Sequence, residues 1–139
     1  MDYLYKQDLE LLESCPPSDY KSYNCECFRW TFNNINDVRN FTSQAKRNPR
    51  VLNSKKDFEK CEYHALSFHD TLKNSIECFE FLCNNFTNIR KNIGTHIAKG
   101  ILNKSDGLGQ NIIDKNGHFN FHPFVNNNFK NNFTIYQKL

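Results

Sequence analysis

Apolar and polar residues follow two kinds of regular pattern along the chain, and each kind predicts one type of element. Residues 25–32 alternate, with Phe28, Trp30 and Phe32 on one side, which is typical of a strand with one buried face. Residues 71–86 have apolar side chains recurring every three or four positions, which predicts an amphipathic helix. These are the two largest apolar surfaces that the sequence predicts, so we expect them to pack together.

Weaker patterns elsewhere complete the expected fold. Helices are expected at 2–13, from 36 or 37 to about 46, and at 54–60, and strands at 63–68, 96–102, 110–113, 118–122 and 133–137. Turns at 106–109 and 115–117 would connect the later strands. This order predicts a single α+β domain over residues 1–139, with one mixed, mainly antiparallel sheet and helices packed on it. The expected core contains Phe28, Trp30, Phe32, Leu66, Phe68, Ile76, Phe79 and Cys83.

The apolar content of the chain lies largely in its aromatic residues. The 13 Phe, 6 Tyr and 1 Trp bury a large area per ring, so they can build a core although aliphatic residues are few. No stretch reaches the ~18 apolar residues that a membrane helix needs, and the acidic start of the chain lacks the pattern of a signal peptide. We therefore expect a cytoplasmic protein without membrane association, whose six cysteines are free thiols.

The net charge of +3 is unevenly distributed along the chain. Residues 1–86 carry 11 basic and 13 acidic side chains, whereas residues 87–139 carry 7 basic and 2 acidic ones. A basic C-terminal half is compatible with a nucleic acid as partner, although its cations are scattered and form no stripe. The preferred partner is a protein, whose identity the sequence does not indicate.

Cysteines and histidines in two places have spacings that occur in metal sites. Cys25 and Cys27 share one face of the first strand, and Cys61 precedes His64 by three positions, which is compatible with zinc ligands. Neither pair is a Cys-x-x-Cys knuckle, and neither is followed by a glycine that would let the backbone turn around a metal. We therefore expect no metal and no cofactor.

Two short motifs resemble known enzyme families. Arg90 followed by His96 is similar to the motif of HEPN ribonucleases, and this resemblance implies that the two side chains assist RNA cleavage by the 2′-hydroxyl. The order of Arg29 on the first strand and Ser67 on the second resembles that of ADP-ribosyltransferases. That resemblance implies that these two residues hold a dinucleotide.

The segment 118–122 combines histidines and phenylalanines in strict alternation. In a strand, His118, Asn120 and His122 share one face, and Phe119 and Phe121 share the core-facing side. Two imidazoles with an amide between them are suited to an anion, a metal or a substrate, because histidine titrates near neutrality. The alternative is that this face is simply the solvent side of an edge strand.

Two functions are compatible with these observations, and the sequence leaves open whether the chain is an enzyme. The first is a small binding or interaction protein, a component of a larger bacterial or phage multi-protein system. The second is a small enzyme that acts on a nucleotide or nucleic acid. The candidate binding residues are Arg29, Ser67, His96, His118, Asn120 and His122. Geometry distinguishes the two, because an enzyme is favoured if Arg29, Ser67 and a histidine line one cleft.

Overall fold

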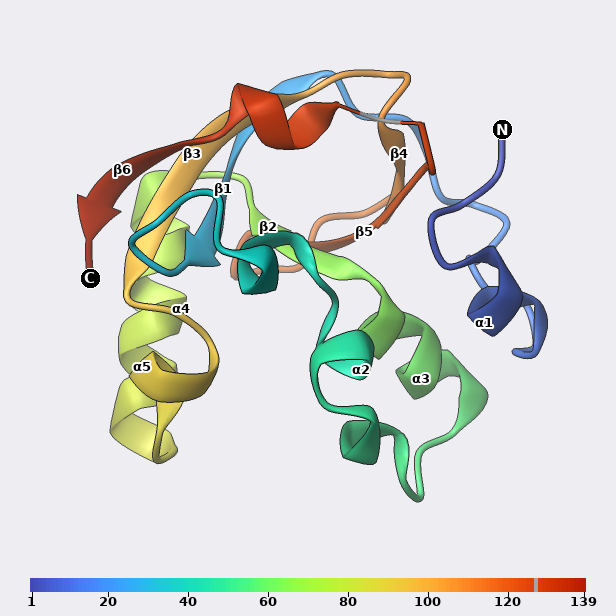
Figure 1. The fold of residues 1–139 in the computed structure, drawn as a ribbon, viewed down its shortest axis with the longest axis horizontal. Coiled ribbons are helices and arrows are strands. Elements are labelled where there is room, and N and C mark those ends of the chain that lie inside the picture. The colour runs from blue at the N-terminus through green and yellow to red at the C-terminus, as the bar shows by residue number, and fades with distance from the viewer. Residues whose placement is uncertain (127) are drawn as a thin grey trace.

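A computed structural model describes residues 1–126 and 128–139 of the chain. Six strands form one sheet in the order β4-β5-β2-β1-β3-β6, and every pairing between them is antiparallel (Figure 1). The strands are β1 (Cys25–Thr31), β2 (Leu66–His69), β3 (His96–Leu102), β4 (Gly107–Gly109), β5 (His118–Pro123) and β6 (Thr134–Lys138). The predicted α+β class is confirmed.

Four of the five helices in the described residues lie in two groups below the strongly curved sheet, and α1 lies apart from them near the N-terminus (Figure 1). The helices are α1 (Lys6–Glu10), α2 (Gln44–Arg47), α3 (Asp57–His64), α4 (Leu72–Asn85) and α5 (Ile89–Asn92). Figure 1 shows α4 and α5 below one end of the sheet and α2 and α3 below the other, with the strands arching above them. No helix in the described residues is long and apolar enough to cross a membrane.

Helix α4 illustrates why the strongest pattern in the sequence was read correctly. The Oγ1 atom of Thr71 accepts a hydrogen bond from the backbone N–H of Asn74 at 3.1 Å, which caps the first turn. The apolar stripe then buries Phe79 against the sheet. The backbone becomes extended at Phe86 and ends the helix there, close to the predicted boundary.

The core of the protein is a cluster of aromatic rings on one face of the sheet. Phe68 of β2 lies 5.8 Å, centroid to centroid, from both Phe119 and Phe121 of β5. Phe129 and Phe133 lie 6.4 and 5.6 Å from the Phe68 ring, and Phe129 lies 6.0 Å from Phe121. All five side chains are at most 3% exposed, so burial of aromatic area dominates the stability of the fold.

The expected single core is divided between the two faces of the sheet. The register pairs Phe28 with His69, which places Trp30 and Ser67 on the same face as these two residues and Phe68 on the opposite face. Trp30 packs on α4, 5.4 Å from the Phe79 ring, and remains partly exposed, as do Ile76 and Cys83. The prediction of one shared core is wrong because β1 is a central strand that is covered on both faces. Alternation shows which β1 residues share a face, but it does not show which residues of other elements pack against that face.

Two expected elements differ in the later part of the chain. Residues 107–109, expected to be a turn, form β4 and pair with β5, whereas 110–113 is not a strand. Gly107 allows this pairing, because a Cβ at this position would collide with the backbone oxygen of His122. Gly117 does adopt the positive φ, 81°, expected for the Asn-Gly connection.

The expectation that all six cysteines are free thiols is wrong. Cys15 and Cys61 form a disulfide that joins the segment after α1 to α3. Their sequence separation of 46 residues carries no local signal, so only the fold could bring them together. The remaining four cysteines are free thiols, and Cys27 is fully buried in the core.

Candidate active site

Ser67 lies in the middle of β2, on the sheet face that α3 and α4 leave partly uncovered. Strand β2 alternates because Leu66 and Phe68 enter the aromatic core, which turns Ser67 and His69 to the opposite side. Ser67 pairs with Asn120 across the neighbouring strand β5. Its side chain is partly exposed and can therefore meet a ligand.

Ser67, His118 and Asp114 form a continuous hydrogen-bonded series. The Oγ atom of Ser67 lies 3.0 Å from Nε2 of His118, and Nδ1 of the same ring lies 2.9 Å from Oδ2 of Asp114. In the neutral ring, both histidine contacts can form in only one tautomer. Because a carboxylate accepts but does not donate, Nδ1 carries the proton and Nε2 accepts the Ser67 hydroxyl hydrogen. His118 is therefore oriented as a base toward Ser67.

The loop before β5 holds Asp114 and His118 in this arrangement. The backbone N–H of Asp114 donates to the His118 carbonyl at 2.9 Å, and that of Gly117 donates to the Asp114 carbonyl at 2.8 Å. Oδ1 of Asn116 accepts from the backbone N–H of His118. Nε2 of Gln110 donates to Oδ1 of Asp114 at 2.9 Å, so both carboxylate oxygens of Asp114 are engaged. This network fixes the carboxylate before any ligand binds.

A cavity of about 650 Å³ opens beside Ser67 and His118. Its size is in the usual range for small-molecule sites. Trp30, Phe81 and Leu82 supply an apolar wall, and α4 provides much of the rim. The full lining consists of Trp30, Ser67, His69, Asn74, Glu77, Cys78, Phe81, Leu82, Lys115, Asn116 and His118.

Two smaller cavities also reach Ser67. One of about 280 Å³ is lined in part by Gln44, Asn120 and His118, together with Glu62 of α3. The other, of about 140 Å³, is lined by Arg29, Arg47 and Gln44, among others. Ser67 thus lies where an apolar cavity, a polar cavity and a cationic cavity meet.

Arg29 makes the smallest cavity electropositive. Its Nε donates to the Asn40 carbonyl at 2.6 Å, and its Nη1 donates to the Ser67 carbonyl at 2.8 Å. Within the described residues, no carboxylate lies at ion-pair distance from this guanidinium. Burial, and then the positive charge of Arg47, lower the pKa of Arg29 to about 10, so it remains protonated at neutral pH.

His69 packs beside the site as a neutral ring. It is 3% exposed, and its ring centroid lies 4.9 Å from that of Trp30. Burial, and then His118, lower the pKa of His69 to about 4, whereas Asp70 and Asp114 act weakly in the opposite direction. At neutral pH His69 therefore extends the apolar wall of the largest cavity.

Acidification is expected to destabilise the fold through His69. The unfolded chain binds a proton at this residue below pH 6.5 and the folded chain only below about 4, so stability is lost as pH falls between these values. The contribution of His69 to this loss is about 3 kcal/mol. We expect His69→Phe to remove that part of the pH dependence in urea unfolding at pH 7 and pH 4. The control His96→Gln should retain it, and an unchanged profile in His69→Phe would contradict the assignment.

The structure brings four of the six sequence-predicted site residues together and separates the other two. Ser67, His118 and Asn120 line one cavity, and Arg29 shares another with Ser67. His96 on β3 lines none of the three cavities that Ser67 reaches, and its Nδ1 instead lies 2.8 Å from the Thr95 hydroxyl.

His122 is buried, at 1% exposed, and lies beside the Cys15–Cys61 disulfide. It does point to the same face of β5 as His118, but that face is not a solvent face along its whole length. Strand β5 is also not an edge strand, because β4 and β2 flank it. The N-terminal segment and α3 cover the His122 end, and only the His118 end reaches the cavities.

Sequence reasoning missed Asp114, His69 and Trp30 as site residues. Asp114 directly precedes the expected turn at 115–117 and has no role in the sequence analysis, although an aspartate four positions before a histidine, across an Asn-Gly connection, can return to that histidine. Trp30 was assigned to the core because its aromatic ring fits the buried face of a strand. The role of His69 depends on the register between β1 and β2, which the sequence does not show.

The chain matches no family model, no curated protein and no solved structure. The chemistry of the site must therefore be inferred from its geometry.

Proposed function

We propose that the chain is a hydrolase in which Ser67 attacks the carbonyl carbon of an ester or amide. The observation that carries this proposal is the series Asp114–His118–Ser67 at the wall of the largest described cavity. His118 takes the Ser67 proton during the attack and returns it to the leaving group, while Asp114 orients the ring and stabilises its cationic form. Water, activated by His118, then releases the acyl group from Ser67.

Gln44 is the proposed donor to the oxyanion that forms during the attack. It lines two of the three cavities at Ser67. Within the described part of the chain, its side-chain amide has no hydrogen-bond partner, so its N–H groups are available to a ligand. A side-chain amide can fill this role, because it donates toward charge that develops on the carbonyl oxygen.

The cavities also define the class of substrate. Trp30, Phe81 and Leu82 favour an apolar or aromatic group on one side of the scissile bond. Arg29 and Arg47 favour a negative charge on another side. A nucleotide carries both an aromatic ring and negative charge. Within esters and amides in general, we therefore propose esters of a nucleotide as the narrower substrate class. This class also agrees with the enzyme expected from the sequence, which acts on a nucleotide or nucleic acid.

A binding or interaction protein is the second candidate, as a cytoplasmic component of a bacterial or phage multi-protein system. The observation that favours it is the exposure of two aromatic side chains, Phe81 on α4 and Phe86 directly after it, which are 61% and 59% exposed and line different cavities. Exposed aromatic side chains next to a cavity suit a protein partner as well as a small molecule.

Labelling with a fluorophosphonate probe tests the hydrolase directly, because such probes react preferentially with activated serines. We expect one adduct per chain, located at Ser67 by peptide mass spectrometry, and slow turnover of nitrophenyl esters with an initial burst. Ser67→Ala and His118→Ala should abolish both signals. The matched control is Ser105→Ala, which removes an exposed loop hydroxyl and should behave as wild type.

The outcomes separate the two candidates. The hydrolase proposal would be refuted if the folded wild-type chain formed no adduct, or if the adduct persisted in Ser67→Ala. The binding or interaction protein would then be the remaining candidate. If a nucleoside monophosphate inhibits the labelling, this result supports a nucleotide ester as the substrate. If it does not inhibit the labelling, nucleotide esters are excluded, but the proposal that Ser67 is the nucleophile still holds.

A further inference from the structure

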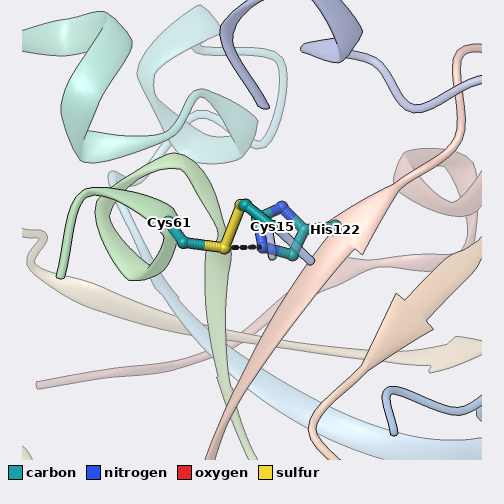
Figure 2. A group of neighbouring side chains, drawn as sticks. All are labelled: Cys15, Cys61 and His122. Carbon is teal, nitrogen blue, oxygen red and sulfur yellow. Dashed lines mark hydrogen bonds between the residues drawn. A yellow bond between two sulfur atoms is a disulfide. The ribbon is translucent and has the colours of Figure 1, made fainter. Parts of the chain in front are cut away.

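Cys15, Cys61 and His122 converge at one point although they come from three separate parts of the chain. Figure 2 shows the two cysteines joined through sulfur, with the His122 ring directed at the Cys61 sulfur. Cys15 lies after α1, Cys61 in α3, and His122 in β5. The Cys61 Sγ atom is 3.6 Å from Nε2 of His122, and the three potential ligand atoms lie within 4.8 Å of one another.

We propose that reduction of the Cys15–Cys61 bond converts this cluster into a zinc site. The ligands are the two cysteine thiolates and Nε2 of His122, and a water molecule completes the tetrahedron. Two thiolates, one imidazole and one solvent position form a known type of zinc coordination. This site is separate from the Ser67 site and does not depend on the proposed hydrolase.

The spacing of the ligand atoms fits zinc with little rearrangement. Typical zinc–sulfur and zinc–nitrogen bonds of about 2.3 and 2.0 Å, in a tetrahedron, separate a sulfur from a nitrogen by about 3.5 Å. The distance between Cys61 Sγ and His122 Nε2 is 3.6 Å, which is already close to this separation. The two sulfurs must separate to about 3.8 Å by the same geometry, which rotation of the Cys15 side chain can supply once the covalent bond is broken.

A dithiol reductant supplies the electrons and protons that convert the disulfide into two thiols. Two electrons and two protons pass from the dithiol to the disulfide, which gives two cysteine thiols and leaves the reductant as a cyclic disulfide. Zinc then displaces one proton from each thiol into solvent and accepts the lone pair of Nε2. The proton of the imidazole remains on Nδ1.

Burial and charge both favour zinc over other occupants. Cys61 and His122 are 4% and 1% exposed, so a bound ion with uncompensated charge would be costly here. Two thiolates neutralise Zn²⁺, which makes the complete site uncharged. Thiolate and imidazole donors also disfavour calcium and magnesium, which prefer oxygen.

The surroundings of His122 leave its ring available for this role. Among the described residues, Nδ1 of His122 has no hydrogen-bond partner, and Nε2 contacts the Cys61 Sγ atom. Tyr3 and Tyr20 pack around it, with ring centroids at 6.2 and 5.8 Å, and hold its orientation. A cytoplasmic environment would keep the cysteine pair reduced and hence in the zinc-binding form.

Metal titration of the full chain in two redox states tests the proposal. After reduction under argon, we expect one equivalent of zinc per chain, and cobalt should give thiolate charge-transfer and tetrahedral visible bands. The oxidised chain should bind less than about a tenth of an equivalent, since a complete set of ligands is needed for high occupancy. Cys15→Ser and Cys61→Ser should lose the bound metal, and His122→Gln should weaken binding at least about tenfold.

Cys78→Ser is the matched control, because it removes a free thiol from α4 and leaves the cluster intact. It should retain one equivalent of zinc. The oxidised wild-type chain serves as a folded negative control if a cysteine variant fails to fold. The proposal is overturned if the reduced wild type binds no zinc, if the oxidised chain binds as much, or if Cys78→Ser abolishes binding.

Discussion

Asp114→Asn is expected to slow the modification of Ser67 by about 10³–10⁴-fold while the protein stays folded. Nε2 of Gln110 donates a hydrogen bond to Oδ1 of Asp114. Because this donor needs an acceptor, the side-chain carbonyl oxygen of an introduced asparagine will occupy the position of Oδ1. Its amide N–H₂ then faces Nδ1 of His118 and forces the ring proton onto Nε2. In that tautomer, His118 can no longer accept the proton of the Ser67 hydroxyl.

The rate of fluorophosphonate labelling over time measures this effect, and urea unfolding shows whether stability is retained. Asp37→Asn is the matched control, because it makes the same change in a carboxylate that is bonded to Arg39 on the surface. A wild-type labelling rate in Asp114→Asn would mean that the carboxylate does not set the tautomer, and the proposed mechanism would lose its orienting group.

Phe68→Ala is expected to lower the free energy of unfolding by about 3–5 kcal/mol. The ring is fully buried and contacts Phe119, Phe121 and Phe133, whose centroids all lie within 5.8 Å of its own. It also lies under the guanidinium of Arg29, at 5.7 Å. Truncation leaves a cavity that four surrounding groups cannot fill without moving.

Urea unfolding followed by circular dichroism gives this number, with an unchanged slope showing that the unfolding transition remains comparable. Phe86→Ala is the control within the same residue type. Phe86 is 59% exposed at the end of α4, so its truncation should change stability by less than about 0.5 kcal/mol. Similar losses in the two variants would contradict the position of the core.

The patterns that were read correctly are those with a local physical cause. Strand β3 matches its predicted bounds, and α4 begins at Leu72, one residue after its predicted start, with the side chain of Thr71 as its cap. The alternation of 118–122 placed His118 and His122 on one face and Phe119 and Phe121 on the core side, as the structure has them. Each of these depends only on the period of a strand or helix and on the residues at its ends.

The pattern of β1 could not reveal which residues it meets. Its alternation correctly grouped Phe28 with Trp30, but the residues opposite them are set by the pairing of Phe28 with His69. That pairing turns Ser67 toward Trp30 and sends Phe68 into the other layer. A shift of one residue would have exchanged these faces, so the candidate site is a consequence of register.

The candidate site was partly predictable because its members are chemically conspicuous. His118 and Asn120 were predicted from residue type and alternation, and Arg29 and Ser67 from a family resemblance; the structure gathers all four around two cavities that Ser67 lines. His122 was predicted by the same alternation and His96 from the other resemblance, but the fold places both elsewhere. The type of a residue indicates which chemistry its side chain can take part in. Only its distance from other side chains in the folded chain decides whether a partner for that chemistry is present.

By itself, the sequence determined the α+β class, the order of most elements and the face on which the histidines of β5 lie, because these follow from local periodicity and capping. Only the tertiary structure decided that His118 reaches Ser67 and that Cys15 meets Cys61. These two contacts join residues 51 and 46 positions apart. Such contacts are created by strand register and by the packing of α3 on the sheet, and these depend on the whole chain at once.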